Sequence, residues 1–234
     1  MGFKKETDLN TCKETAKTMC EAVPIKPVYG MFVSHPFVNN IFTMIKIDGE
    51  LKTINLIDSE DYKKWKQSLD KEIDSAKDII SVYLMINIPY RLVMIKYWKD
   101  NLSRKDFSML LSDAWVVSEN PNKDINVSVN ELKRWFKQAD KQVLMDKDEF
   151  KKLESLPDEF DIYRGIGDES NPKGLSWTRD LDTAKWFRDR FKSKNPYILR
   201  AKIKKQYCLA YFIGRNEDEI VIDYNKITDK EILK

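Results

Sequence analysis

Three short segments in the last third of the chain contain the side chains best able to do chemistry. In chain order they are Tyr163-Arg164-Gly165, Gly174-Leu175-Ser176-Trp177-Thr178 and Glu217-Asp218-Glu219-Ile220-Val221-Ile222. Together they supply a guanidinium, two hydroxyls and two neighbouring carboxylates. A guanidinium binds phosphate oxygens through paired hydrogen bonds, and a carboxylate stabilises a cation that develops beside it. These segments are therefore the first candidates for a catalytic site.

The β-strand period predicts which of these side chains point the same way. Alternate side chains of a strand share a face. We therefore expect Glu217 and Glu219 on one face of a strand, with Asp218 opposite. Ser176 and Thr178 are expected to share a face in the same manner. The two hydroxyls and two carboxylates would then converge on one cleft.

The remaining residues of the segments fit the same cleft. Trp177 lies between the two hydroxyl residues and is expected to pack on the opposite face of their strand. Arg164 ends a short strand-like piece and is followed by Gly165 and Gly167. Glycine lets a backbone bend sharply and approach a ligand closely. The arginine is therefore expected beside a ligand.

The order of an arginine, a Ser-x-Thr and a Glu-x-Glu resembles the ADP-ribosyltransferases of the Arg–Ser–Glu type. These enzymes cleave NAD and move ADP-ribose onto an acceptor. The resemblance covers about residues 90–234. It extends to a broad set of phage and bacterial ADP-ribosyltransferase-like proteins in three stretches, NLSRKDFSMLLSDAW, NPNKDINVS and GLSWTRDLDTAKWF. The loop Lys192–Pro196 is shorter than in many of these proteins, where it touches NAD and the target.

The resemblance implies a role for each residue. Arg164 binds the NAD pyrophosphate, and Glu219 stabilises the ribose cation through the 2′-hydroxyl. Ser176 orients Glu219 and the nicotinamide ribose, with support from Thr178. Glu217 meets the acceptor, and in the family a glutamate there accompanies arginine acceptors. The residues expected to contact NAD are Arg164, Gly165, Ser176, Trp177 and Thr178.

The function expected from this resemblance is mono-ADP-ribosylation of a macromolecule, with a protein arginine as the acceptor, by a toxin or a phage–host effector. An antitoxin or inhibitor is a further expected partner. Three alternatives stay open. The acceptor is a nucleic acid, the module is catalytically silent and binds NAD or a partner, or the motifs are ordinary strands of an interaction protein.

Composition sets the outer bounds. The chain has 234 residues, 42% hydrophobic and 34% charged, with a formal net charge of +3, which is the balance of a soluble globular protein. Cys12, Cys20 and Cys208 show no metal-binding spacing, and His35 is the only histidine, so no metal is expected. No secretory leader and no run of about 18 apolar residues is present. These features predict a cytoplasmic protein, in the host cytosol if phage-encoded, with no membrane partner.

The fold class expected is α+β, with an ADP-ribosyltransferase-like fold in which helices precede a mainly antiparallel split β-sheet. The sequence suggests an N-terminal tail at 1–27, in which the polar residues 1–22 suit either a helix or a loose segment. It also suggests a small hairpin and helix subdomain at 28–89 and a catalytic domain at 90–234, with a soft boundary at Pro89.

Local signals place the elements. Asp48-Gly49 predicts a hairpin between Phe42–Ile47 and Leu51–Leu56. Helix starts are expected at Asp58 or Ser59, Ser103, Ser128, Asp146 and Asp180. Residues 79–88 suit either a strand or a buried helix. Strands are expected at Asp161–Arg164, Leu175–Thr178, Tyr197–Ile203, Cys208–Phe212 and Glu219–Ile222.

Overall fold

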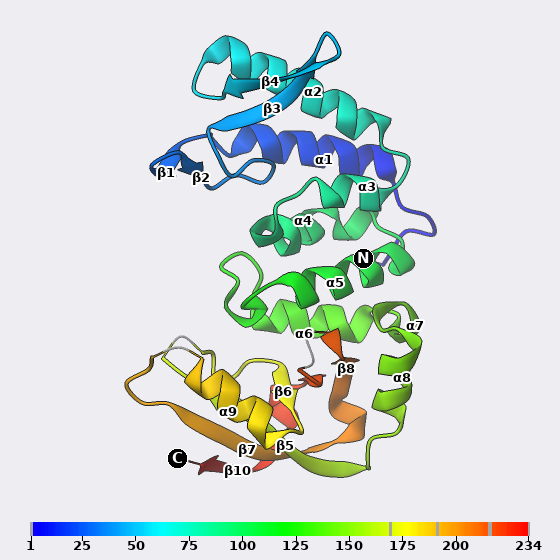
Figure 1. The fold of residues 1–234 in the computed structure, drawn as a ribbon. Coiled ribbons are helices and arrows are strands. Elements are labelled where there is room, and N and C mark those ends of the chain that lie inside the picture. The colour runs from blue at the N-terminus through cyan, green and yellow to red at the C-terminus, as the bar shows by residue number, and fades with distance from the viewer. Residues whose placement is uncertain (1, 169, 191, 215–216, 234) are drawn as a thin grey trace. The chain divides into compact units, whose positions relative to one another are not determined.

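The computed structural model describes the whole chain apart from residues 1, 169, 191, 215, 216 and 234. It divides into two compact units, residues 1–110 and 111–234 (Figure 1). The division falls inside a helix, α5 (Arg104–Val117), whereas the sequence suggested a boundary at Pro89. The difference arises because the helices around Pro89 contact the first helix of the chain and so belong to the first unit.

The first unit begins with a helix, which is one of the two possibilities that the sequence left open for residues 1–22. Helix α1 (Leu9–Ala22) is capped by Asp8 and buries Cys12, Ala16 and Cys20. It packs against α2 (Ser59–Ser75), α3 (Ile79–Leu84) and α4 (Arg91–Trp98). Segment 1–27 is therefore an integral part of this unit. The ambiguous stretch after Asp78 is helical, since the Asp78 side chain accepts a hydrogen bond from the Ser81 amide.

The predicted hairpin is present. Strands β3 (Phe42–Ile47) and β4 (Glu50–Asn55) pair antiparallel, and Asp48 and Gly49 both have positive φ, 52° and 86°. Positive φ at both central residues gives the two-residue turn whose twist matches a hairpin. A second, shorter pair is formed by β1 (Pro27–Tyr29) and β2 (Phe32–Val33). Short 3₁₀ turns at Ile88–Tyr90 and Lys99–Asn101 flank α4.

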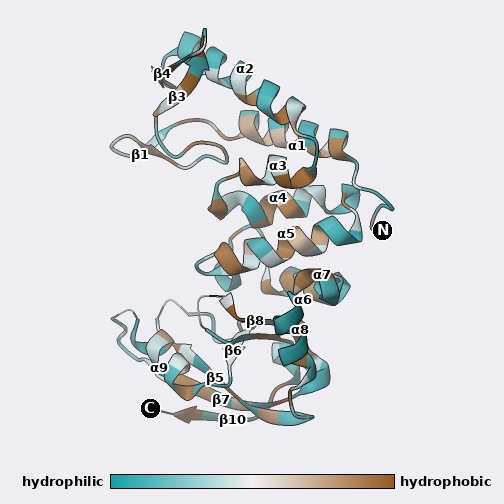
Figure 2. Cartoon of the chain, turned by 45° about the vertical axis from the view of Figure 1, so that its right-hand side comes forward, coloured by the Kyte–Doolittle hydropathy of each residue, from teal (hydrophilic) through white to brown (hydrophobic). Residues whose placement is uncertain are grey.

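The second unit contains the helix starts predicted at Ser128, Asp146 and Asp180. Helices α6 (Val129–Gln138) and α8 (Lys147–Glu154) each begin with a capping box, Ser128 with Glu131 and Asp146 with Glu149. The short helix α7 (Lys141–Leu144) joins them, and a 3₁₀ turn, η3 (Pro121–Lys123), precedes α6. Figure 2 shows that α8 and α2 are largely hydrophilic. Helix α4 of the first unit, by contrast, buries four consecutive apolar residues, Leu92 to Ile95.

The described part of the second unit forms a six-stranded antiparallel sheet in the order β10-β7-β5-β6-β9-β8. This confirms the mixed α+β class with an antiparallel sheet. The strands are β5 (Glu159–Ile166), β6 (Ser176–Thr178), β7 (Tyr197–Lys204), β8 (Cys208–Phe212), β9 (Glu219–Ile222) and β10 (Thr228–Leu233). Strand β10 has no counterpart in the sequence-based prediction. It is largely exposed and polar, so it lacks the apolar pattern that marked the other strands.

The pairing between β5 and β6 is the shortest in this sheet. The two strands share a single register pair, Tyr163 with Thr178, whereas β5 and β7 pair along their whole length. Helix α9 (Leu181–Asp189), which Asp180 caps, follows β6 and packs against β5. Short 3₁₀ turns at Lys205–Tyr207 and Tyr224–Lys226 precede β8 and β10. The edge at which β5 and β6 separate is where the candidate site lies.

None of the helices in the described ranges is long and apolar enough to cross a membrane.

Candidate active site

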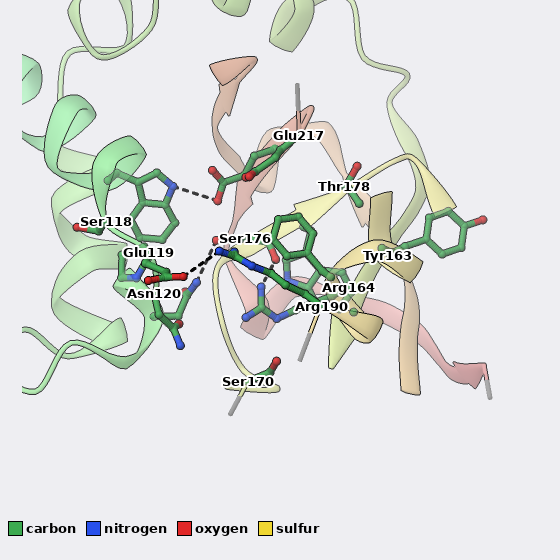
Figure 3. A pocket seen from close by; sticks show the side chains of 18 residues that line it. Ser118, Glu119, Asn120, Tyr163, Arg164, Ser170, Ser176, Thr178, Arg190 and Glu217 are labelled. Atoms are coloured by element: carbon green, nitrogen blue, oxygen red, sulfur yellow. Dashed lines mark hydrogen bonds and ion pairs between the residues drawn. The ribbon is translucent and has the colours of Figure 1, made fainter. Parts of the chain in front are cut away.

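A cavity of about 530 Å³ opens in the second unit, and all the predicted site residues line it (Figure 3). Arg164 and Gly165 come from β5, and Ser176–Thr178 form β6. Glu219 begins β9, and Glu217 lies just before it. The residues predicted from the three segments therefore come together around one cavity, although the backbone does not bring all of them there in the expected way.

Glu219 is held by two hydrogen-bond donors. The indole Nε1 of Trp115, on α5, donates to its Oε1 at 3.1 Å, and the Ser176 hydroxyl bonds to the same carboxylate. Burial raises the pKa of Glu219 above its ordinary value, and these two bonds act in the opposite direction. The nearby charge of Glu217 also raises this pKa, and that of Arg164 lowers it. Glu219 is thus a partly desolvated carboxylate in a fixed orientation.

Arg164 uses much of its guanidinium to hold the protein itself. Its Nε and Nη2 donate to the Asn171 carbonyl at 3.3 and 3.2 Å, and its Nη1 donates to the Ser176 carbonyl. A guanidinium has five N–H donors, so one hydrogen on each Nη is left over from these contacts to meet a ligand in the cavity. Burial lowers the pKa of Arg164 to about 10, which still leaves it charged at neutral pH.

Two glycines make close packing possible around Arg164. A Cβ on Gly165 would lie 2.2 Å from the Ala184 carbonyl oxygen and 2.4 Å from the Arg188 amide nitrogen, so this glycine lets α9 pack on β5. A Cβ on Gly174 would lie 2.4 Å from Nη2 of Arg164. Gly165 lines the cavity as predicted from the sequence. A glycine is needed there, however, because a larger residue would collide with α9, and not because a ligand must approach the backbone.

The prediction that Glu217 and Glu219 share one face of a strand is wrong. Strand β9 begins at Glu219, and Asp218 has a φ of 44°, in the left-handed region, so the alternation of a strand does not extend back to Glu217. Asp218 itself does not line the cavity. Its carboxylate instead contacts Nζ of Lys152 at 2.9 Å and accepts a hydrogen bond from the Tyr211 hydroxyl at 3.2 Å. The turn, rather than a shared strand face, brings Glu217 to the cavity beside Glu219.

Thr178 and Trp177 line the cavity and form hydrogen bonds to the neighbouring backbone. Thr178 is buried and lies opposite Glu219 in the strand register. Its Oγ1 accepts a hydrogen bond from the Asp180 amide at 3.1 Å, immediately before α9. Trp177 is buried as expected, and its Nε1 donates to the Gly174 carbonyl at 3.1 Å. Both residues therefore fix the path of the chain around β6.

Two residues of the site were not predicted from the sequence. Trp115 and Asn122 lie in the stretches NLSRKDFSMLLSDAW and NPNKDINVS, but no role in the site was assigned to either. The Asn122 side chain is buried and bonds to Ser176. A buried asparagine after a turn proline leaves no signal of its partners in a single sequence.

A charged pair also borders the cavity without having been anticipated. Nη2 of Arg190 lies 2.8 Å from Oε1 of Glu119, and both residues line the cavity (Figure 3). The Arg190 guanidinium also lies over the ring of Trp186, 5.2 Å from its centroid. Glu119 is largely exposed, so this pair sits at the solvent edge of the site.

Within the described ranges, no group of three or more His, Cys, Asp or Glu side chains is arranged to hold a metal ion. Comparison of the chain with protein-family models, with curated proteins and with solved structures gave no match.

Proposed function

We propose that this cavity binds NAD and that the protein transfers ADP-ribose from NAD to a macromolecular acceptor. The observation that carries the proposal is the Glu219 carboxylate, fixed by Trp115 and Ser176 in a cavity that is also lined by the half-buried Arg164. The size of the cavity is in the range of small-molecule sites, about 300–1,000 Å³. The resemblance of the three sequence segments to Arg–Ser–Glu ADP-ribosyltransferases names the substrate.

The chemistry proposed is cleavage of the bond between the nicotinamide nitrogen and the ribose C1′. Nicotinamide leaves with the electron pair of that bond, and positive charge develops on the ribose. The ionised Glu219 stabilises this charge at close range in a desolvated setting, where electrostatic effects are strong. The two Nη hydrogens of Arg164 that point away from the carbonyls bind the pyrophosphate.

The acceptor then forms the new bond to C1′. A protein arginine is the acceptor proposed, because Glu217 adds a second carboxylate beside Glu219 that suits pairing with a guanidinium and taking up its proton. When water takes the place of the acceptor, the products are ADP-ribose and a proton. A toxin-like role in a cytoplasm, with an antitoxin or inhibitor as partner, is proposed from the resemblance alone.

A nucleic acid is the second candidate acceptor. Trp186 is 54% exposed beside the cavity-lining Phe187, and the Arg190 guanidinium lies over its ring. Aromatic and guanidinium planes of this kind stack with single-stranded bases.

The experiment is incubation of the pure protein with NAD labelled in the adenylate part. The acceptors offered are agmatine, a protein lysate, RNA and single-stranded DNA, and released nicotinamide is measured in parallel. The proposal predicts nicotinamide release and label on agmatine or lysate protein. Label on RNA or DNA alone would move the assignment to the second candidate. No release of nicotinamide with any acceptor would contradict both.

A matched pair of variants ties the activity to the cavity. Glu219→Gln removes the charge inside the cavity, and Glu159→Gln makes the same change at an exposed position on β5. Activity must disappear in the first variant and persist in the second.

A further inference from the structure

The Asn122 side chain lines the inner wall of the cavity with both ends of its amide engaged. It is only 6% exposed. Its Oδ1 accepts from the Leu175 backbone N–H at 2.7 Å, and its Nδ2 lies 3.0 Å from Oγ of Ser176. A backbone N–H can only donate, so the end of the amide that faces Leu175 must be the oxygen. The amide therefore has one orientation, with its NH₂ group toward Ser176.

This orientation settles the direction of the next hydrogen bond. An amide NH₂ donates and cannot accept, so Oγ of Ser176 is the acceptor from Asn122. The single hydrogen of the Ser176 hydroxyl must then point elsewhere. The hydroxyl also bonds to the Glu219 carboxylate, which is an acceptor when ionised. The hydrogen bonds thus run one way, from Asn122 to Ser176 to Glu219, and we call this directed chain of hydrogen bonds the relay.

The frame that holds Asn122 also holds Arg164. Nδ2 of Asn171 donates to the Asn122 backbone carbonyl at 3.1 Å, and the Asn171 carbonyl accepts from Arg164. A Cβ added to Gly174 would lie 3.0 Å from Cγ of Asn122 and closer still to Arg164. Asn122 is therefore packed closely against Gly174 and tied to the segment that holds Arg164.

We infer that Asn122 is a positioning residue, which acts through Ser176 by aiming its hydroxyl hydrogen at the Glu219 carboxylate. Asn122 donates to Ser176 rather than to Glu219, and its influence on the reaction is indirect. Its importance for catalysis rests on the proposed function. Its control over the state of Glu219 does not, because that state is measurable without NAD.

The Trp115 indole supplies the readout. Its N–H donates to Glu219, so its ¹H–¹⁵N resonance is expected to move as Glu219 gains a proton. Trp115→Phe identifies the signal by removing it. The signal is followed from about pH 3.5 to about pH 8, a range that includes the ordinary value for glutamate and its upward shift. A Trp115 signal that does not titrate would overturn the inference, since Glu219 would then not be its acceptor.

The decisive variant is Asn122→Asp. The shape is kept, but an oxygen replaces the NH₂ group, so the Ser176 hydrogen turns toward residue 122 and a negative charge is added nearby. The titration midpoint should rise by roughly one pH unit, because the ionised Glu219 loses a donor and gains a like charge. Asn130→Asp, at an exposed position in α6, is the control and should leave the midpoint in place. The same midpoint in Asn122→Asp and wild type would overturn the inference.

Ser176→Ala separates the relay from a direct charge effect. This change alone should raise the midpoint, and Asn122→Asp should raise it less in the Ser176→Ala background than in wild type. An equal rise in both backgrounds would show that residue 122 acts only through its charge and would contradict the relay. If Asn122→Asp does not fold, Ser176→Ala still decides, since an unchanged midpoint there would remove the middle step.

Steady-state kinetics add the catalytic consequence. At pH values below the new midpoint, Asn122→Asp should lower kcat for NAD hydrolysis about tenfold and leave KM nearly unchanged, because both ends of the Asn122 amide are engaged by Leu175 and Ser176. A rise in KM with an unchanged kcat would contradict a positioning role. If wild type cleaves no NAD while the Trp115 titrations behave as described, the proposed function fails and the relay stands.

Discussion

The two units differ in what surrounds their buried polar side chains. In residues 111–234, Asn122 and Thr178 are buried around a cavity, and each has hydrogen-bond partners there. In residues 2–110 the buried His35 is satisfied by the Cys20 carbonyl and the Phe37 amide, and it does not line that cavity. The hairpins of the first unit expose large apolar side chains, with Tyr29 83% and Leu51 72% exposed.

This difference shows where chemistry is to be sought. Burying polar groups is costly unless they are hydrogen-bonded, so a cluster of satisfied polar groups around a cavity indicates a site that is held in one geometry. Exposed apolar side chains on short hairpins hold no reactive group in place. We therefore expect changes in the second unit to alter the reaction with NAD and changes in the first to leave it intact.

The largest effect is expected for Glu219→Gln. The change is nearly isosteric but removes the charge that faces the ribose cation, so both NAD hydrolysis and transfer should fall about 10²–10³-fold. Thermal unfolding should show that the variant remains folded. A variant as active as wild type would place the reactive carboxylate elsewhere.

Glu217→Ala should separate the two activities. Transfer to agmatine is expected to fall roughly a hundredfold, because the acceptor loses the group that takes its proton, while NAD hydrolysis persists. The ionised Glu219 is the active form, and loss of the neighbouring charge lowers its pKa, so the acidic limb of the hydrolysis profile should move to lower pH. If hydrolysis and transfer fell together, Glu217 would belong to the NAD site. If transfer survived, the arginine acceptor would be excluded.

Arg164→Lys should weaken NAD binding roughly tenfold to a hundredfold, as measured by calorimetric titration. An ammonium cannot bind the Asn171 and Ser176 carbonyls and a pyrophosphate at the same time in the way a guanidinium does. Arg200→Lys is the control, since Arg200 lies on β7 and pairs with Asp161 and Glu231 outside the cavity. Equal affinity of both variants for NAD would leave Arg164 with a structural role only.

Gly165→Ala tests how closely α9 packs against β5 beside the cavity. The added Cβ would overlap the α9 backbone, so we expect the free energy of unfolding to fall by at least about 2 kcal/mol in urea denaturation. Gly2→Ala is the matched change in the first unit, where a Cβ meets nothing within 4 Å, and should alter stability by less than about 0.5 kcal/mol. Similar values for the two variants would mean that α9 does not pack on β5 as closely as described.

The smallest effect is expected for Tyr29→Ser in the first unit. The side chain is largely exposed, so both stability and the rate of NAD hydrolysis should stay close to the wild-type values. A large loss of hydrolysis would show that the first unit takes part in the reaction, and the contrast between the units would fail.

Signals that act over a few residues predicted much of the fold correctly. The Asp48-Gly49 turn and the capping boxes at Ser128 and Asp146 specify their elements locally, and the structure contains each of them. Strand β10 was missed because its exposed residues carry no apolar alternation, and its pairing with β7 is set by long-range contacts.

The site was predicted in part for the same reason. Side chains from β5, β6 and the start of β9 were singled out because they stand in segments whose residue types suggest chemistry. Trp115 and Asn122 lie in stretches of the resemblance but were given no role, since their roles come from contacts with residues far along the chain. The left-handed Asp218 also went unseen, because an aspartate within an apparently continuous strand pattern gives no sign of positive φ.

The central claim is that NAD occupies the cavity of the second unit, and the tryptophan indole resonances test it directly. Trp115 and Trp177 line the cavity, whereas Trp65 and Trp98 are buried in the first unit. Each signal is assigned by a Phe substitution, and NAD is titrated into Glu219→Gln so that it is not consumed. The account predicts saturable shifts of the Trp115 and Trp177 signals, with Trp65 and Trp98 unmoved. Shifts confined to the first unit, or none at millimolar NAD, would contradict it.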